Sequence, residues 1–296
     1  VVDGTVVYFT SEGGAVESAC TTKDNACSVK LTSQNFRPQN GRVTILARTT
    51  GEEAFVDLNS NGTVDNSLEM YDADYNATDI GEAYLDYDEN GVRDPQKEPY
   101  IDFNGNGLFD GITLGGNVGA TSSGDGLYNG LLCTAGANIC SGQKSIDVRA
   151  SIVIVFSTST AVIGINGGNP IVLDPCSVAA KSAGAPSIIT VIVVDQNGNA
   201  MPAGTNVTFA SDNGSIVGQG TYTVPNTAGC NSSAPGCPPI PLGTAAFGAI
   251  SVTMKSDGTY SKDTNSCTNS AAVGTFNVKV VTPNSVVTEA SMSVSD

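Results

Sequence analysis

Short stretches rich in Val, Ile and Thr, each bounded by Gly, Asn, Pro or Asp, recur along the chain. Apolar and polar residues alternate within them or form brief apolar runs, which is typical of β-strands joined by tight turns. No stretch combines helical spacing of apolar residues with a capping residue. The sequence therefore predicts an all-β protein built of β-sandwiches. The predicted strands are residues 4–11, 42–49, 145–156, 187–195, 204–211, 247–255 and 274–282.

Two of these stretches are copies of one another. Residues 4–11 and 204–211 carry Gly, Thr, Val, Phe and Ser at the same places. A pair of cysteines seven residues apart follows each copy, and a second pair of similar strands, 41–49 and 274–282, comes after the cysteines. The chain therefore contains an internal duplication.

The duplication also predicts the domain organisation. Residues 186–204, an apolar strand and a turn, precede the second copy, whereas nothing comparable precedes the first. We expect two tandem sandwiches, residues 1–156 and 157–296, the first without its opening strands. Because a sandwich without them exposes strand edges and core, a strand from elsewhere is expected to fill the gap. An acidic insertion at about 52–111 and a cysteine-stapled loop at 112–144 interrupt the first sandwich.

One run of the second copy resembles a known family. Residues Asp195–Ser211 read D-x-N-G-N-A-x-P-x-G-T-x-V-x-F-x-S, and Asp3–Ser11 match the end of this run. The run is similar to the bacterial immunoglobulin-like domains of invasin and intimin. The resemblance covers most of 157–296, and within 1–156 only the parts outside the insertion. It implies an extracellular module, strung in tandem on a bacterial surface as a stalk or adhesin, without catalytic residues.

Acidic side chains are concentrated in one window. Residues 52–110 hold 16 of them against only Arg93 and Lys97, so this window contributes −14 of the formal charge of −16. A chain this acidic cannot neutralise phosphates in bulk, which excludes nucleic acid as a partner. Mutual repulsion also opposes compaction of the window unless cations bind there.

Within the acidic window one phrase occurs three times, starting at Glu53, Glu82 and Glu98. Written generally it is E-[AP]-[FY]-[VLI]-D-x-[ND]-x-N-G-x-x-D, which places oxygen-bearing side chains at loop positions 1, 3, 5 and 9 and a glycine at position 6. Calcium requires about six to eight oxygen ligands, and this arrangement wraps them around one ion, with the carbonyl of position 7 added. The predicted ligands of about three Ca²⁺ ions are Asp57, Asn59, Asn61, Thr63 and Asp65; Asp86, Asp88, Asn90, Val92 and Asp94; and Asp102, Asn104, Asn106, Leu108 and Asp110.

The loops differ from an EF-hand because no glutamate stands at position 12 and no flanking helices are predicted. Glu69 and Glu98 lie one residue further on, and Glu53, Glu82 and Glu98 lie four residues ahead of a loop. We expect carboxylates such as Glu69, Glu82 and Glu98, some from a neighbouring repeat, to complete the metal shells. The pattern resembles the short calcium loops of thrombospondin type 3 repeats and dockerins. The insertion is then expected to be ordered only when loaded with calcium.

The eight cysteines indicate an oxidising, extracellular compartment. Three couples stand seven residues apart, which leaves one long-range couple. Metal ligation is the disfavoured alternative, because this spacing is not a chelating one and the chain has no histidine to assist. Eight cysteines allow 105 pairings, so the pairing is inferred from the regular spacing alone. The predicted disulfides are Cys20–Cys27, Cys133–Cys140, Cys230–Cys237 and Cys176–Cys267.

The absence of histidine excludes Ser/His/Asp and Cys/His nucleophile pairs and His-ligated zinc. A catalytic metal is disfavoured because a saturated oxygen shell leaves no open position. Acidic pairs such as Glu52 and Glu53 admit a glycoside hydrolase, but 29 acidic residues produce such pairs without function. We therefore expect no enzymatic activity.

The sequence favours a bacterial cell-surface structural protein, stiffened by calcium, that acts as a stalk or as a filament subunit associating through strand complementation. Its expected partners are copies of itself or neighbouring immunoglobulin-like domains, and the longest apolar runs are too short to span a membrane. The alternative is an adhesin or carbohydrate-binding module that presents its calcium loops to a host or surface glycan. Phe55, Tyr84 and Tyr100 would then form a sugar platform, whereas the simpler interpretation is that they pack successive loops together.

Overall fold

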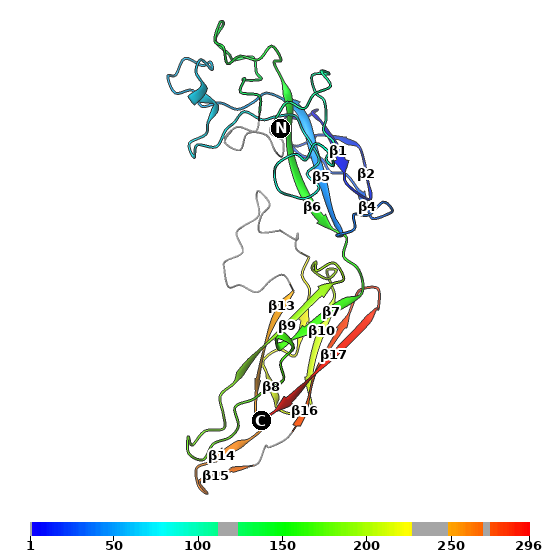
Figure 1. Cartoon of the computed structure of the whole chain (residues 1–296), viewed down its shortest axis with the longest axis vertical. Helices are drawn as coiled ribbons and strands as arrows, with labels where there is room; N and C mark the ends of the chain where they lie inside the picture. Colours follow the sequence, from blue (N-terminus) through cyan, green and yellow to red (C-terminus); the bar gives the residue numbers. More distant parts are fainter. Residues whose placement is uncertain (1, 112–123, 227–247, 269–272) are drawn as a thin grey trace. The chain divides into compact units, whose positions relative to one another are not determined.

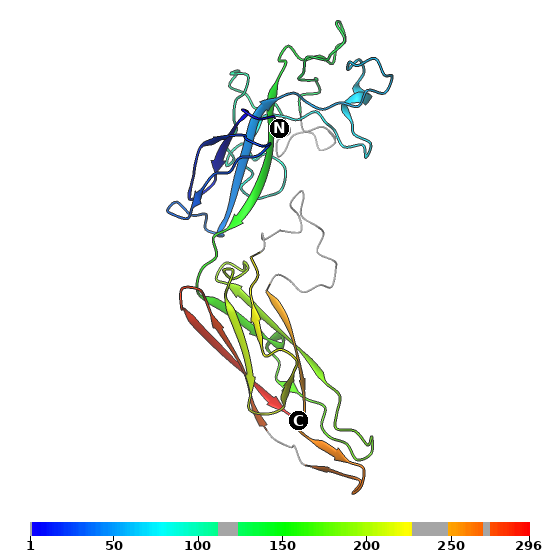
Figure 2. The ribbon, with the colours of Figure 1, turned by 180° about the vertical axis from the view of Figure 1, so that it is seen from behind.

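The chain forms two compact units of β-structure (Figures 1 and 2). The first unit reaches residue 154 and the second begins at 155, two residues before the predicted boundary, although 39–41 belong to the second. The predicted all-β class is confirmed, because the described residues contain only two short 3₁₀ helices, η1 (Ser67–Met70) and η2 (Asn166–Gly168). Neither helix is long or apolar enough to cross a membrane. The computed structural model describes residues 2–111, 124–226, 248–268 and 273–296.

The first unit is built on a four-stranded sheet in the order β3-β1-β5-β6, with β1 antiparallel to both β3 and β5. A separate antiparallel ribbon consists of β2 and β4. Between β5 and β6 the chain leaves the sheet for the acidic insertion, which Figure 1 shows as loops beside these two strands. The strands are β1 (Val6–Ser11), β2 (Ala15–Val16), β3 (Ala19–Thr21), β4 (Leu31–Thr32), β5 (Arg42–Gly51) and β6 (Ile146–Val155).

The second unit contains two facing sheets, in the orders β12-β10-β16-β17-β8 and β11-β13-β9-β7, and a small hairpin of β14 and β15. All pairs in these sheets are antiparallel except β17 with β8. The strands are β7 (Ala161–Ile165), β8 (Ile171–Val172), β9 (Ser187–Asp195), β10 (Asn206–Ser211), β11 (Ser215–Val217), β12 (Thr221–Thr223), β13 (Ala249–Lys255), β14 (Thr259–Ser261), β15 (Ser266–Thr268), β16 (Val273–Val281) and β17 (Val287–Ser295).

Alternate residues of the strands form the core between these two sheets. Val191 of β9 and Met254 of β13 meet Val207 of β10 and Phe276 of β16, and all four side chains are fully buried. The rings of Phe209 and Phe276 stack with centroids 6.1 Å apart. Because successive side chains of a strand point to opposite faces, this alternation explains the period-two pattern of the sequence. The second unit is a two-layer β-sandwich.

The duplication is visible in the topology. The order β3-β1-β5-β6 repeats β12-β10-β16-β17, and the ribbon of β2 and β4 repeats the pair of β11 and β13. The register corrects the sequence alignment: Ser11 faces Ile45, whereas its copy Ser211 faces Phe276, a shift of two residues from the expected match. A two-residue shift keeps the same side chains on the same face, so the sequence pattern conceals it.

The inner face of the first sheet is less covered than that of its copy. Val207 and Phe209 are 0% and 5% exposed in the second unit. The equivalent Val7 and Phe9 are only half-buried. The described residues of the first unit contain no counterpart of β9, which pairs with β13 in the second unit, or of β7, which pairs with β9. Val7 and Phe9 are therefore less buried than Val207 and Phe209, and the absence of opening strands from the first sandwich stays a prediction.

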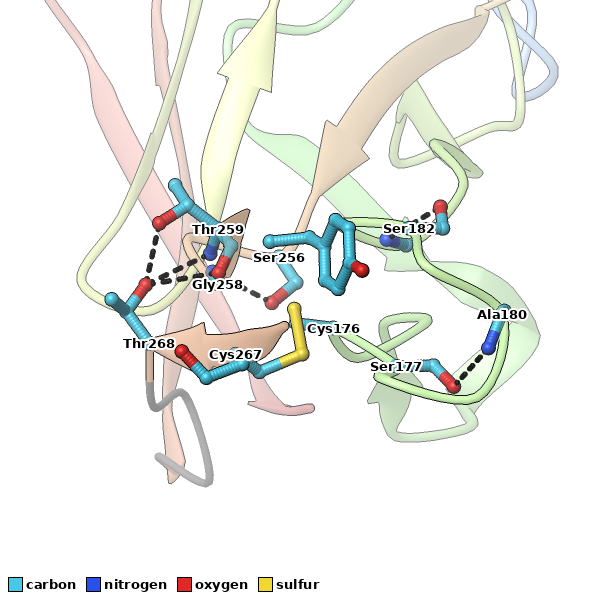
Figure 3. Close-up of a disulfide and its surroundings, with 12 residues drawn as sticks. Cys176, Ser177, Ala180, Ser182, Ser256, Gly258, Thr259, Cys267 and Thr268 are labelled. Carbon is cyan, nitrogen blue, oxygen red and sulfur yellow. Dashed lines mark hydrogen bonds between the residues drawn. A yellow bond between two sulfur atoms is a disulfide. The ribbon is translucent and has the colours of Figure 1, made fainter. Parts of the chain in front are cut away.

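Disulfides staple both units, with half-cystine Cα atoms 5.8–6.0 Å apart. Figure 3 shows one of them joining the segment after β8 to β15, where Thr259 and Thr268 are hydrogen-bonded across the hairpin. Such bridges indicate an oxidising, extracellular or secreted environment. Cys230 and Cys237 lie outside the described residues. Three predicted pairs are formed, namely Cys20–Cys27, Cys133–Cys140 and Cys176–Cys267.

Candidate metal centre

The three repeated phrases fold into loops of one backbone shape. We name residues 57–65 loop 1, 86–94 loop 2 and 102–110 loop 3, and we number their positions from the first aspartate. Positions 4 and 6 are left-handed in every loop. Glycine adopts this conformation without strain and stands at position 6 throughout, whereas position 4 is serine, glutamate or glycine. The φ angles are 62°, 60° and 74° at Ser60, Glu89 and Gly105, and 79°, 78° and 76° at Gly62, Gly91 and Gly107.

The first aspartate organises each loop from within. One of its carboxylate oxygens accepts the position 5 N–H at 3.1 Å in all three loops. Its other oxygen accepts the glycine N–H of position 6 at 2.7, 2.8 and 2.8 Å. The side chain of position 5 accepts the N–H of position 7, which is Thr63, Val92 or Leu108, at 2.8, 2.7 and 2.6 Å. The oxygens of positions 1 and 5 are thereby fixed, and the aspartate oxygen that accepts the glycine N–H keeps a second lone pair for another ligand in each loop.

Each loop also encloses one buried glutamate. Loop 1 encloses Glu69, loop 2 encloses Glu98 and loop 3 encloses Glu82, and each glutamate accepts backbone hydrogen bonds there. None of the three is more than 2% exposed. Every one of them accepts the N–H groups of positions 2 and 9. These distances are 3.1 and 2.9 Å for Glu69, 2.9 and 2.7 Å for Glu98, and 2.6 and 3.2 Å for Glu82. Loop 3 thus takes its glutamate from the repeat before it.

No described residue forms an ion pair with these three glutamates. A buried carboxylate without a cation is unfavourable, and burial raises the pKa of Glu82 and of Asp86. In loop 2, oxygens of Asp86, Asp88 and Glu98 lie within 4.8 Å of one another. A divalent cation among them would relieve both the burial cost and the repulsion. This set of hard oxygen ligands suits calcium.

The carboxylate of position 9 has the same partners in loops 1 and 3 and a different partner in loop 2. In loop 1 the Asp65 carboxylate accepts the side-chain amides of Asn59 and Asn61 at 2.8 and 2.7 Å. Loop 3 repeats this arrangement, because Asn104 and Asn106 donate to Asp110 at 2.5 and 3.0 Å. In loop 2 the carboxylate of Asp94 instead lies 2.9 Å from the exposed ammonium group of Lys97. Among the described residues, carboxylate oxygens converge only in loop 2, at Asp86, Asp88 and Glu98, and Asp94 lies outside this group because it pairs with Lys97.

A fourth buried glutamate has the same surroundings, which the sequence did not reveal. Glu53 is 4% exposed and forms no ion pair with a described residue. It accepts the N–H groups of Ile80 and Asn129 at 2.8 and 2.7 Å, as the other glutamates accept positions 2 and 9. Burial, the largest cause, raises its pKa to about 7.

Two separate segments complete the loop around Glu53. Asp79 stands at position 1, and one of its oxygens accepts the N–H of Gly126, which is left-handed like every position 6, at 2.8 Å. Asp125 stands at position 5 and accepts the N–H of Leu127 at 2.9 Å. Burial raises the pKa of Asp125 as well. We name residues 79–80 and 124–129 together the divided loop.

A sequence signal for the divided loop exists in retrospect. Residues 124–129 read G-D-G-L-Y-N and repeat G-N-G-L-F-D at 105–110, the second half of loop 3. All four glutamates also share the pattern Glu-x-aromatic. The signal was missed because the two halves of the divided loop are separated by more than forty residues, and no local motif joins them. The glutamates that carry this pattern are Glu53, Glu69, Glu82 and Glu98.

Loop 2 is anchored to the outer face of the first sheet. The guanidinium of Arg42 on β5 donates to both carboxylate oxygens of Glu89 at 2.5 and 2.7 Å. The hydroxyl of Thr44 donates to the backbone carbonyl of Asp86 at 2.8 Å. Leu46, on the same face, is 2% exposed and packs against apolar residues of the insertion. The insertion therefore covers the outer face of β5, which carries Arg42, Thr44 and Leu46.

The aromatic residues ahead of the loops pack against other aromatic rings. Phe55 meets Tyr128 of the divided loop edge to face, with ring centroids 5.5 Å apart. Tyr84 and Tyr100 both meet Phe109 of loop 3, at 5.8 and 5.5 Å. The rings thus join loops to one another, which favours the packing interpretation over a sugar platform.

No protein-family model matches the chain, and no curated protein matches its sequence. The resemblance to invasin and intimin domains remains a prediction from the residues.

Proposed function

We propose that the chain is a non-enzymatic, calcium-stiffened structural module of a bacterial extracellular or cell-surface protein, serving as part of a stalk or filament. One observation carries the proposal. Four buried glutamates occupy equivalent places in loops of one hydrogen-bonding pattern, and none of them forms an ion pair with a described residue. Each is a buried carboxylate that accepts two backbone N–H groups of its loop, and a bound cation would compensate its negative charge.

Calcium would act here as a cross-link. The insertion carries most of the net charge of the chain, so repulsion opposes its compaction. Each bound Ca²⁺ cancels two charges and ties together backbone segments that are distant in sequence. Extracellular modules bind at roughly 10⁻⁴ to 10⁻³ M, so millimolar calcium outside a cell would saturate these loops.

Hydrogen exchange followed by mass spectrometry tests this function. In millimolar calcium, the amides of positions 5, 6, 7 and 9 are expected to exchange slowly. After chelation the same amides should exchange rapidly, while β9, β10 and β16 of the second unit keep their protection. Equal exchange of the insertion in calcium and in chelator would contradict the proposal.

Self-association is part of the proposal and rests on the inner face of the first sheet. Val7 and Phe9 are half-buried there, whereas β9 and β7 complete the equivalent sandwich of the second unit. A second copy of the chain is the proposed source of a strand for this face, by strand addition. Light scattering in calcium should then show an assembly at micromolar protein. A monomer under these conditions would limit the function to a stalk module.

A further inference from the structure

The segment closed by the Cys133–Cys140 disulfide contacts two of the four loops through its backbone. Its first arm pairs with Val64, position 8 of loop 1, in a parallel bridge to Cys133. The N–H of Val64 donates to the carbonyl of Leu132 at 2.8 Å, and its carbonyl accepts the N–H of Thr134 at 2.8 Å. The hydroxyls of Thr63 and Thr134 add a hydrogen bond of 2.8 Å.

The second arm repeats this contact on the divided loop. Tyr128, which is position 8 there, lies in a parallel bridge to Cys140. Its N–H donates to the carbonyl of Ile139 at 2.7 Å, and its carbonyl accepts the N–H of Ser141 at 3.0 Å. Each arm therefore holds position 8 of a loop. The next residue, position 9, donates its N–H to the buried glutamate.

The two arms enclose a small apolar cluster. Val64 and Tyr128 are buried there, and Cys133 and Ile139 pack against them. Because the disulfide fixes the arms at a Cα separation of 5.8 Å, it also fixes the distance between loop 1 and the divided loop. No hydrogen bond between described residues joins residues 132–141 to loop 2 or loop 3.

We propose that the Cys133–Cys140 disulfide positions loop 1 and the divided loop for calcium, so that this bridge and the two ions stabilise each other. The inference rests on the calcium-binding function proposed above. Thermodynamic linkage requires the effect to be reciprocal: losing the bridge weakens calcium binding at these two loops, and calcium opposes loss of the bridge.

The chain contains a matched control bridge. Cys20–Cys27 has the same sequence separation of seven residues and a similar Cα separation of 6.0 Å. Its cysteines are also half-buried. It lies at β3, and no hydrogen bond between described residues joins it to any of the four loops. General effects of calcium on reduction would therefore appear at both bridges, and linkage at only one.

The first test measures reduction of the native protein by dithiothreitol in 5 mM calcium chloride and in chelator at equal ionic strength. A thiolate of the reagent attacks one sulfur and displaces the other cysteine as a thiolate. Its second thiol then closes a cyclic disulfide and releases the first cysteine, so one reagent molecule is oxidised for each bridge reduced. Free thiols are alkylated and located by peptide mass spectrometry.

Calcium is expected to slow reduction of Cys133–Cys140 by about tenfold or more, through stabilisation of the bound state. Reduction of Cys20–Cys27 should change by less than about twofold, because no candidate ligand contacts it. Equal calcium effects at the two bridges would overturn the inference. The measurement uses the unmutated protein and does not depend on a variant that folds.

The second test compares calcium titrations of a Cys133→Ser/Cys140→Ser variant and a Cys20→Ser/Cys27→Ser variant. Loss of a supporting contact typically weakens metal binding about 10- to 100-fold, so two of the ions should bind that much more weakly to the first variant only. Unchanged affinity in the first variant would refute the positioning role while leaving calcium binding intact. If the unmutated protein binds no calcium, the proposed function itself fails, and the two failures are thereby distinguished.

Discussion

Single buried carboxylates dominate the chemistry of the acidic insertion. Exposed acidic side chains of the insertion, such as Asp72 and Asp74, are solvated by water at little cost. The glutamates at the loop centres are different, because burial removes that solvation and only backbone N–H groups replace it. Their charge is tolerated only when a cation or a proton compensates it. Replacing one of them therefore tests the account at the scale of a residue.

Glu98→Gln is expected to weaken calcium binding at loop 2 by about 10- to 100-fold, because a charged oxygen ligand is replaced by a neutral one of the same shape. Isothermal titration calorimetry would measure the loss. Asp74→Asn is the control, since Asp74 is exposed in the same insertion and belongs to none of the four loops. Equal effects of the two substitutions would show that only overall charge matters.

Gly62→Ala tests the left-handed backbone of position 6. A methyl group there would meet no atom within 4 Å, so the cost is purely conformational. Its φ of 79° makes that cost about 1–2 kcal/mol, which corresponds to roughly a 5- to 30-fold loss of affinity at loop 1. Gly142→Ala, also in open space but without a positive φ, should leave calcium binding unchanged. No loss in the Gly62 variant would argue against this loop shape in the bound state.

At the scale of strands, the two copies of the duplicated strand differ in what covers them. β1 and β10 share a sequence pattern and a place in their sheets, yet only β10 faces a complete second sheet. Sheet pairing thus follows the local pattern, whereas burial depends on neighbours from other parts of the molecule. The same substitution in the two strands should therefore have unequal consequences.

Val207→Ala is expected to destabilise the second unit by about 2–3 kcal/mol, because it removes two methyl groups from a fully buried site. Val7→Ala, at the equivalent half-buried position, should cost less than about 1 kcal/mol. Chemical denaturation with separate probes for the two units would measure both. A cost at Val7 as large as that at Val207 would mean that this face of the first sheet is fully covered in solution.

The attachment of the insertion to β5 is also a property of elements. Arg42→Met leaves Glu89 buried without its partner, and Glu89 has a side-chain exposure of only 6%. The expected loss is about 3 kcal/mol of stability in the first unit. Lys279→Met is the control, because its pair with Glu289 is exposed on both sides and is worth about 0–1 kcal/mol. Similar losses in thermal unfolding would contradict the anchoring role of Arg42.

For the whole molecule, local patterns were predictable and long-range arrangements were not. The strands and loops 1 to 3 follow from turn residues and spacing within about a dozen positions. Two arrangements depend on tertiary contacts that no local motif records. Glu82 accepts hydrogen bonds from loop 3, and the divided loop is assembled from residues 79–80 and 124–129. The two-residue shift in the register of β5 was not predictable from the sequence, because it leaves the same side chains on the same face of the sheet.

The two units should also respond differently to calcium. The second is a two-layer sandwich with its own apolar core, so we expect its stability to need no ion. The described core of the first consists of small clusters that include residues of the insertion, so its order depends on what holds the loops together. Calcium is therefore expected to act on the first unit while the second stays folded in chelator.

Counting the ions bound to the intact chain tests this account most directly. Native mass spectrometry and calorimetric titration, both with metal-free protein at neutral pH, would give the stoichiometry. The account predicts about four calcium ions per chain, one for each buried glutamate, with dissociation constants at or below about 10⁻³ M. Absence of saturable binding at millimolar calcium would contradict it.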